Sequence, residues 1–225
     1  MRNYAANPPT PSPATSYPRQ DRHPHNLRAI EPVELAEWVE GRLERISRRW
    51  YQEMIRRDAL GTGALAEAMR DFLDVLVSFL PVLVGSHRDQ VESTWAEATE
   101  LFGALGAQRG LSAGEVVEEF QVLREAVIRL LYQDPPLGGR LPLSLREVLR
   151  LNRAIDKGVT HASVGHTDAL FFSLFEGSGI PDTPPNDELV AEVNAQVKAF
   201  RAELRETLGG RLPGEGFLDH TPEDE

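Results

Sequence analysis

Histidine and carboxylate side chains are the groups in this 225-residue sequence that could hold a metal ion or transfer protons, because the chain contains no cysteine. His161 and His166 are five residues apart on a predicted helix, about 140° around its axis, so they do not form the i, i+4 pair that grips one ion. A di-iron site would need Glu-x-x-His pairs on facing helices, and this spacing is missing from the sequence. We therefore predict no metal site, no resident cofactor and no enzymatic activity.

Four polar residues on two predicted helices are candidates for ligand binding, namely Arg124, Asn152, Asp156 and His166. A buried Asn or Asp must be hydrogen-bonded, because leaving it unpaired costs about 1–3 kcal/mol. One interpretation is therefore an interhelical network that fixes helix register, with Arg124 paired to Asp156. The alternative is a polar lining for a small ligand between helices. His166 is interpreted as a hydrogen-bonded core or interface histidine, with a haem ligand as the alternative.

Charged residues form two stripes on the predicted helices. The acidic stripe is expected to be a solvated face and consists of Glu115, Glu118, Glu119 and Glu125. The basic stripe is expected to pair with Glu44 and Glu53 of its own helix, and it consists of Arg45, Arg48, Arg49, Arg56 and Arg57.

Helical periodicity dominates the elements that must position these groups. Apolar residues between positions 31 and 175 recur at steps of three and four, without the alternation typical of strands. We expect an all-α bundle of about five core helices and a C-terminal amphipathic helix. The expected core helices are 32–55, 64–81, 89–108, one that begins at the capping box Ser112-Ala113-Gly114-Glu115, and 144–175. The inward column of the last helix is expected to be Leu145, Leu149, Asn152, Ile155, Val159, His166 and Leu170.

A sixth helix, over residues 186–208, is predicted as an interaction element. Its apolar residues alternate at steps of four and three, as in a short heptad seam, and include Val193, Val197, Phe200 and Leu204. Three arrangements stay open: the helix folds back on the bundle, pairs with its copy in a second chain, or docks on another protein.

Charge and proline content divide the chain into four zones. Residues 1–30 are expected to be a disordered Pro-rich tail, 31–179 a helical sensory or regulatory bundle, 180–210 a linker and amphipathic helix, and 211–225 an acidic tail. The formal net charge is −11, and residues 176–225 alone carry 4 basic and 12 acidic residues. This acidity argues against a nucleic-acid partner and predicts a contact with another protein, or with a second copy, near the C-terminal end.

The longest apolar run, residues 72–84, predicts a buried core helix rather than a membrane span. It contains Asp74 and Pro81 and is thirteen residues long, whereas a span needs about 20 residues. The N-terminus lacks the charged and apolar pattern of an export signal, so a cytoplasmic location is expected.

Two motifs resemble a known family of bacterial signalling domains. The run GAQRGLSAGEVVEEFQVLREAVIRLL, residues 106–131, and the stretch LNRAID, residues 151–156, resemble the N-terminal domain of RsbRD-type stressosome co-antagonists and a helical sensory region found in front of histidine kinases. The resemblance implies a non-catalytic sensory domain that passes a signal to an output module. Fifty residues follow Phe175, too few for such a module. The expected function is therefore regulation through protein–protein contact, with a small-ligand or haem-binding helical sensor as the alternative.

Overall fold

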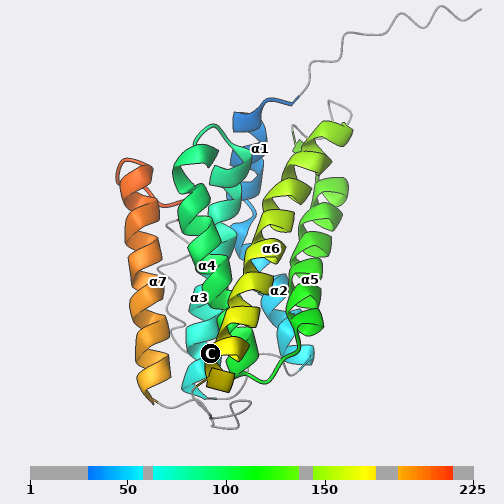
Figure 1. Ribbon diagram of the computed structural model, residues 1–225. Coiled ribbons are helices and arrows are strands. Elements are labelled where there is room, and N and C mark those ends of the chain that lie inside the picture. The colour runs from blue at the N-terminus through cyan, green and yellow to red at the C-terminus, as the bar shows by residue number, and fades with distance from the viewer. Residues whose placement is uncertain (1–29, 58–62, 137–143, 176–186, 215–225) are drawn as a thin grey trace, which may run out of the picture.

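The computed structural model describes residues 30–57, 63–136, 144–175 and 187–214, and within these ranges the chain forms seven α-helices and no strand. The helices run along one long axis and pack side by side (Figure 1). Their bounds are α1 Pro32–Glu40, α2 Leu43–Arg56, α3 Ala64–Val84, α4 Arg88–Gln108, α5 Ala113–Gln133, α6 Leu145–Phe175 and α7 Asp187–Thr207. The predicted all-α helical bundle is confirmed. No helix among the described residues is both long and apolar enough to cross a membrane.

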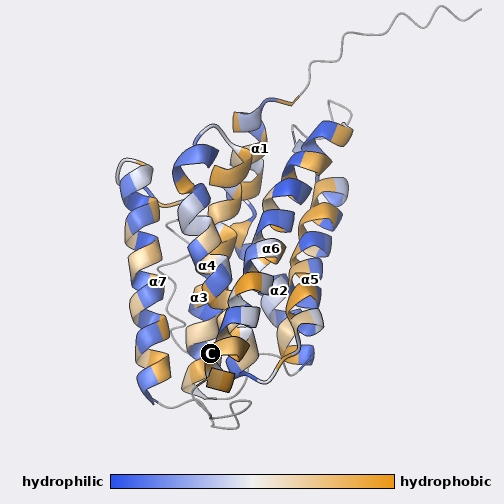
Figure 2. Cartoon of the chain, in the orientation of Figure 1, coloured by the Kyte–Doolittle hydropathy of each residue, from blue (hydrophilic) through white to orange (hydrophobic). Residues whose placement is uncertain are grey.

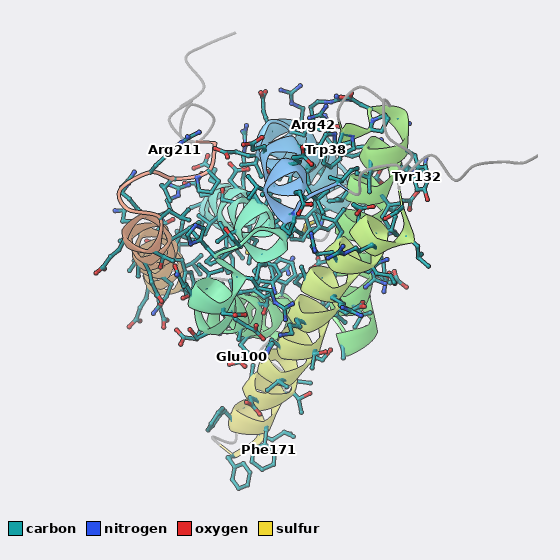
Figure 3. All side chains as sticks on the ribbon, turned by 90° about the horizontal axis from the view of Figure 1, so that it is seen from above. Trp38, Arg42, Glu100, Tyr132, Phe171 and Arg211 are labelled. Carbon is teal, nitrogen blue, oxygen red and sulfur yellow. The ribbon has the colours of Figure 1, made fainter. Side chains whose placement is uncertain are left out.

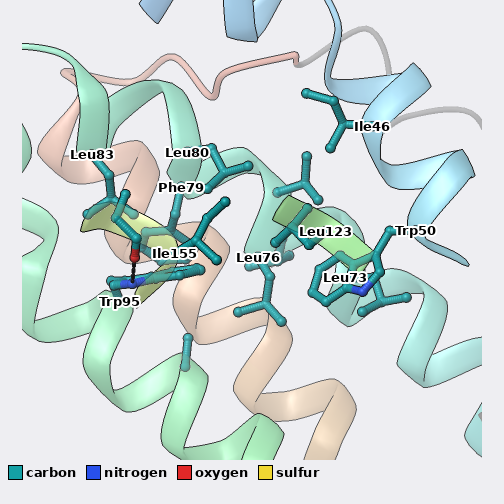
Figure 4. Packing of buried hydrophobic residues seen from close by; sticks show 14 of the residues in the cluster. Ile46, Trp50, Leu73, Leu76, Phe79, Leu80, Leu83, Trp95, Leu123 and Ile155 are labelled. Carbon is teal, nitrogen blue, oxygen red and sulfur yellow. Dashed lines mark hydrogen bonds between the residues drawn. The ribbon is translucent and has the colours of Figure 1, made fainter. Parts of the chain in front are cut away.

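Helix α3 lies at the centre of the core. Every residue from 72 to 84 except Asp74 is buried, as predicted for a core helix. Large aromatic side chains pack here. Phe79 of α3 contacts Trp95 of α4 at 5.7 Å between ring centroids, and Trp50 of α2 lies at the other end of the same core (Figure 4). The indole nitrogen of Trp95 also donates to the Ala154 carbonyl of α6 at 3.2 Å, so the core ties four helices together.

The single helix predicted over residues 32–55 is wrong, because the chain breaks into α1 and α2 at Gly41 and Arg42. Glycine is a weak helix former, and the amide of Arg42 bonds the Val39 carbonyl three residues back rather than four. The Arg42 side chain secures the break: it donates to the Trp38 carbonyl at 3.0 Å and to the Asp134 carboxylate at 2.7 Å. The two short helices can therefore follow different faces of the bundle.

The sequence predicts that the second long helix kinks or ends at Pro81; the helix does not end there, since α3 continues to Val84 with Gly85 as its C-cap. A proline removes one intrahelical hydrogen bond. Here Pro81, Val82, Leu83 and Val84 are all buried, and their burial offsets the lost bond.

Helices α4 and α6 approach so closely at Gly103 and Gly165 that no side chain would fit at these two positions. A Cβ atom added at Gly103 would lie 1.8 Å from the Ala162 carbonyl oxygen, and one added at Gly165 would lie 2.0 Å from that of Glu100. The inward column predicted for residues 144–175 is therefore partly wrong, since Leu145 and Leu149 are 70% and 43% exposed. The buried face is built mostly of small residues, and it comprises Leu151, Ala154, Ile155, Gly158, Ala162, Gly165 and His166 together with Glu147.

Helix α7 folds back on the bundle and packs against α3 and α4 (Figure 1). Phe200 stacks on Phe72 of α3 with ring centroids 6.3 Å apart, and Thr94 of α4 donates to Glu203. The predicted interaction residues are buried inside this contact, and they are Val193, Val197, Phe200 and Leu204. Of the three arrangements left open by the sequence, the structure has the first, so this seam is part of the core.

The core also includes residues from the two segments that are predicted as tails. Ile30, at the end of the predicted tail, is 3% exposed, and Leu212, in the predicted acidic tail, is 2% exposed. Residues 1–29, the linker residues 180–186 and residues 215–225 lie outside the described part of the chain.

Candidate functional site

The predicted pair of Arg124 and Asp156 is present. The Arg124 guanidinium on α5 donates to the Asp156 carboxylate on α6, and the two side chains are 24% and 59% exposed. Asn152, one helical turn before Asp156, has a buried side-chain oxygen without a hydrogen-bond partner. The Arg124–Asp156 pair therefore links two neighbouring helices near the surface, and the Asn152 oxygen takes no part in this link.

His166 does not join that group. It lies ten residues beyond Asp156 on the same helix, about 15 Å along the axis, and it is 2% exposed. Its Nε2 atom is 2.7 Å from the Leu111 carbonyl in the α4–α5 turn. Since a carbonyl only accepts, Nε2 carries the proton and is not free to ligate a haem iron. The four predicted ligand-binding residues are therefore not brought to one place.

A buried ion pair that was not predicted from the sequence lies beside the α4–α5 turn, which His166 also contacts. The Arg109 guanidinium at the end of α4 contacts both carboxylate oxygens of Glu119 on α5 at 3.2 Å, and the side chains are 4% and 2% exposed. The prediction of a solvated acidic face is wrong for Glu119. The signal was available, because Glu119 lies three residues after Val116 and four before Leu123, on the apolar stripe of its helix.

The surroundings of this pair explain its burial. Arg109 also lies over the Phe102 ring at 5.6 Å, and the indole nitrogen of Trp50 donates to the Glu119 carbonyl at 2.9 Å. Burial raises the pKa of the Glu119 carboxyl, and the charge of Arg109 opposes that rise. The paired charges and the aromatic rings fix the α4–α5 turn, against which His166 holds α6.

The remaining charged stripe is arranged partly as predicted. Arg48 pairs with Glu44 and Arg56 pairs with Glu53 within α2. Arg57 instead reaches Glu118 of α5 at 3.1 Å. Within the described ranges no group of three or more His, Asp or Glu side chains is placed to hold a metal ion.

The last nine residues of α6 leave the core. His166 is the final buried residue of this helix, and none of residues 167–175 is buried. The large apolar side chains of this segment are more than half exposed: Phe171 56%, Phe172 66%, Leu174 69% and Phe175 75%. We call these four residues the α6 tip. Seen along the bundle axis, α6 extends away from the other helices and Phe171 lies at its free end (Figure 3).

The tip is an apolar surface without a covering element among the described residues. Phe171 and Phe175 contact each other at 4.5 Å between ring centroids, and the corresponding end of α6 is strongly hydrophobic (Figure 2). Each such side chain forgoes about half of the roughly 1.5–3 kcal/mol that full burial provides. Clustered exposed apolar residues of this kind typically mark an interaction site. The sequence signal was the run ALFFSLF, residues 169–175, which periodicity alone assigned to the end of a core helix.

A groove lies at the end of the bundle opposite the α6 tip. It has a volume of about 350 Å³ and lies between α1, the end of α3 and the segment after α7. Its apolar lining comprises Val33, Ala36, Pro81, Val82, Leu208 and Pro213, and its polar rim comprises Glu37, Glu40, His87 and Arg211. Arg211 donates to Glu40 across the groove at 2.9 Å. None of the four predicted ligand-binding residues lines it.

Comparisons with protein-family models, with curated proteins and with solved structures give no match. The family resemblance described above therefore rests on its two motifs alone, and the geometry of the α6 tip is the main guide to function.

Proposed function

We propose that this chain is a non-catalytic regulatory module that acts through protein–protein contact, and that the α6 tip is its contact surface. One observation carries the proposal: four large apolar side chains, each more than half exposed, lie together on a helix end that projects from the bundle. Monomeric proteins rarely leave a contiguous apolar patch larger than a few hundred Å² uncovered, which is roughly the scale of functional patches.

The position of the tip supports a regulatory role. Helix α6 has 31 residues, about 46 Å at 1.5 Å per residue, so it connects the Arg124–Asp156 pair in its first half with the tip at its C-terminal end. The LNRAID motif that carries the resemblance to sensory domains lies on this same helix. A change in helix packing near the motif would therefore alter the presentation of the tip.

A site-specific cross-linking experiment tests the proposal. Because the chain contains no cysteine, Phe172→Cys introduces a single thiol that can carry a maleimide-linked photo-cross-linker. Tyr132→Cys on α5 is the matched control, since Tyr132 is 65% exposed and Phe172 is 66% exposed. Both labelled proteins are illuminated in extract from the cells that make the protein, and adducts are identified by mass spectrometry.

We expect a defined protein adduct from position 172 that is absent from position 132. Equal adducts from the two positions, or none from position 172, would reject the tip as a contact surface. Competition with unlabelled wild-type protein should remove the adduct, whereas competition with unlabelled Phe172→Ser protein should not.

The groove between α1, α3 and the segment after α7 favours a second candidate, a small-ligand sensor. Its volume of about 350 Å³ lies within the roughly 300–1,000 Å³ range of ligand pockets. An apolar floor with one ion pair at its rim suits a small amphipathic molecule. Binding of an environment-sensitive apolar fluorophore to wild-type protein, weakened by Ala36→Trp, would support it. Equal binding by the two proteins would contradict it.

A further inference from the structure

The outward side of α6 carries a heptad pattern of its own. Thr160, Val164, Thr167, Phe171 and Leu174 follow one another at steps of four, three, four and three residues, and all five are exposed. This spacing is the pattern by which one helix packs along another in a coiled coil. We call these five residues the outer seam. The small residues of α6, on the other side, are already covered by α4.

The outer seam is nearly free of charge in an acidic chain. Between residues 160 and 175 Asp168 is the sole Asp, Glu, Lys or Arg, whereas the whole chain has a formal net charge of −11. A partner recognised by charge would find only Asp168 to pair with here. In a two-fold contact the same patch meets itself, so an uncharged seam avoids placing like charges together.

We propose that a second copy of this chain occupies the outer seam, with the two α6 helices packed antiparallel. A shallow depression precedes the tip on the same helix, lined by Val159, Thr160, Ser163, Val164, Thr167 and Asp168. An antiparallel pair places the tip of each copy over the depression of the other. A parallel pair would instead set depression against depression and tip against tip.

The heptad pattern sets the register of this pair. Alternating core positions of two antiparallel helices face each other, so Val164 faces the partner's Leu174 and Thr167 faces the partner's Phe171. The contact involves one short helix segment per copy, less than a standard interface, so we expect a weak dimer with a Kd in the micromolar range. The inference rests on the proposed function, because it assigns an occupant to the same surface.

Sedimentation and light scattering over a broad concentration series test the dimer. We expect wild-type protein to shift from the 25.0 kDa of one chain toward twice that mass, and Leu174→Ser to remain monomeric over the same series. Leu145→Ser is the matched control, because Leu145 lies on the same helix and is 70% exposed against 69% for Leu174; it should dimerise like wild type. A wild-type chain that stays monomeric, or a Leu174→Ser variant that dimerises normally, overturns the inference.

Disulfide trapping tests the register. Single-cysteine Val164→Cys and Leu174→Cys proteins are mixed under mild oxidation, and the products are separated by mass after proteolysis. The antiparallel pair predicts the mixed 164–174 disulfide as the main product. A preference for disulfides between identical positions, in particular 174 with 174, overturns the antiparallel arrangement.

The outcomes separate this inference from the proposed function. A monomeric wild-type protein whose position 172 still cross-links another protein in extract rejects self-pairing and leaves the tip as a contact surface. A dimer that persists in Leu174→Ser and yields no position-172 adduct rejects both.

Discussion

Helices α7 and α6 each carry a heptad seam, but the α7 seam is buried, whereas the outer seam of α6, which runs into the tip, is exposed. The four α7 residues, from Val193 to Leu204, are at most 5% exposed against α3 and α4. The residues of the α6 tip, from Phe171 to Phe175, are at least 56% exposed. The acidic C-terminal helix that resembles an interaction element is thus part of the core, and the end of a presumed core helix is the uncovered surface.

The difference shows that a heptad seam alone does not decide where a helix binds. Helix α6 uses its small residues to approach α4, and a Cβ atom at Gly165 would collide with the α4 backbone. Its larger side chains are then left on the outside. Helix α7 has one apolar face, and Phe200 fits it to Phe72.

The largest expected effect comes from breaking the covered seam. Phe200→Ala removes a buried ring stacked on Phe72, and we expect the free energy of unfolding to fall by about 3–5 kcal/mol. Urea titration followed by circular dichroism measures it. Phe172→Ala, at the uncovered tip, is the matched control and should change stability little. A similar fall in the free energy of unfolding for both substitutions would contradict the distinction between the buried α7 seam and the exposed α6 tip.

The next largest effect is expected at the buried pair of Arg109 and Glu119. Glu119→Ala removes the carboxylate that faces the buried Arg109 charge, and we expect the free energy of unfolding to fall by about 3 kcal/mol. The same denaturant titration measures this loss. Glu118→Ala, one residue earlier and 65% exposed, should cost far less, and an equal cost would contradict the role assigned to burial.

The pH dependence of Glu119 sharpens the same test. Burial raises the pKa of the Glu119 carboxyl above its ordinary value of 4.5. A carboxyl whose pKa is higher in the folded than in the unfolded chain stabilises the folded chain when it is protonated. This contribution is complete below the pKa of the unfolded chain and is lost as the pH rises through the pKa of the folded chain. We therefore expect wild-type protein to lose stability relative to Glu119→Gln as pH rises above 4.5. A constant difference in unfolding free energy between the two proteins across this range would contradict it.

A smaller effect is expected at the inner side of α6. Gly165→Ala places a methyl group against the Glu100 carbonyl, and forced separation of packed helices typically costs about 1–3 kcal/mol. Gly114→Ala in the first turn of α5 is the control, since its Cβ would meet only the Ser112 hydroxyl oxygen at 3.8 Å, and it should be neutral or stabilising. Thermal unfolding of both variants gives the comparison, and equal melting temperatures would count against the close contact.

The smallest expected effect on stability lies at the tip itself. Phe172→Ser changes a side chain that is 66% exposed, so the free energy of unfolding should change by at most about 0.5 kcal/mol. Retention on a hydrophobic-interaction column should nevertheless fall more than for Tyr132→Ser. A large loss of stability would show that Phe172 is covered in solution.

Much of the fold was predictable because periodicity reports large apolar residues. The capping box at Ser112 and Glu115 is present as predicted, with the Glu115 amide 3.3 Å from the serine hydroxyl. The break at Gly41 was not predicted because the spacing of the apolar residues continues through it. The inner face of α6 was misplaced because glycine and alanine are too small to mark a buried face in the pattern of large apolar residues.

The candidate site was harder to predict. The Arg124–Asp156 pair could be anticipated because both residues lie on neighbouring predicted helices. The tip could not, since its exposure depends on where α6 stops contacting α4 and α5. His166, the last buried residue of α6, contacts the Leu111 carbonyl of the α4–α5 turn, and no pattern within one helix encodes this tertiary contact.

The glycine contact between α4 and α6 constrains how the tip can move. A shift of α6 by one residue, a rise of about 1.5 Å with a turn of about 100°, would bring Val164 or His166 to the place of Gly165 and drive a side chain into the Glu100 carbonyl. The close contact therefore opposes a change of register between α4 and α6. A movement of the tip that keeps this register would carry α4 with α6, and a distance label on α4 would report such a movement as well as one on α6.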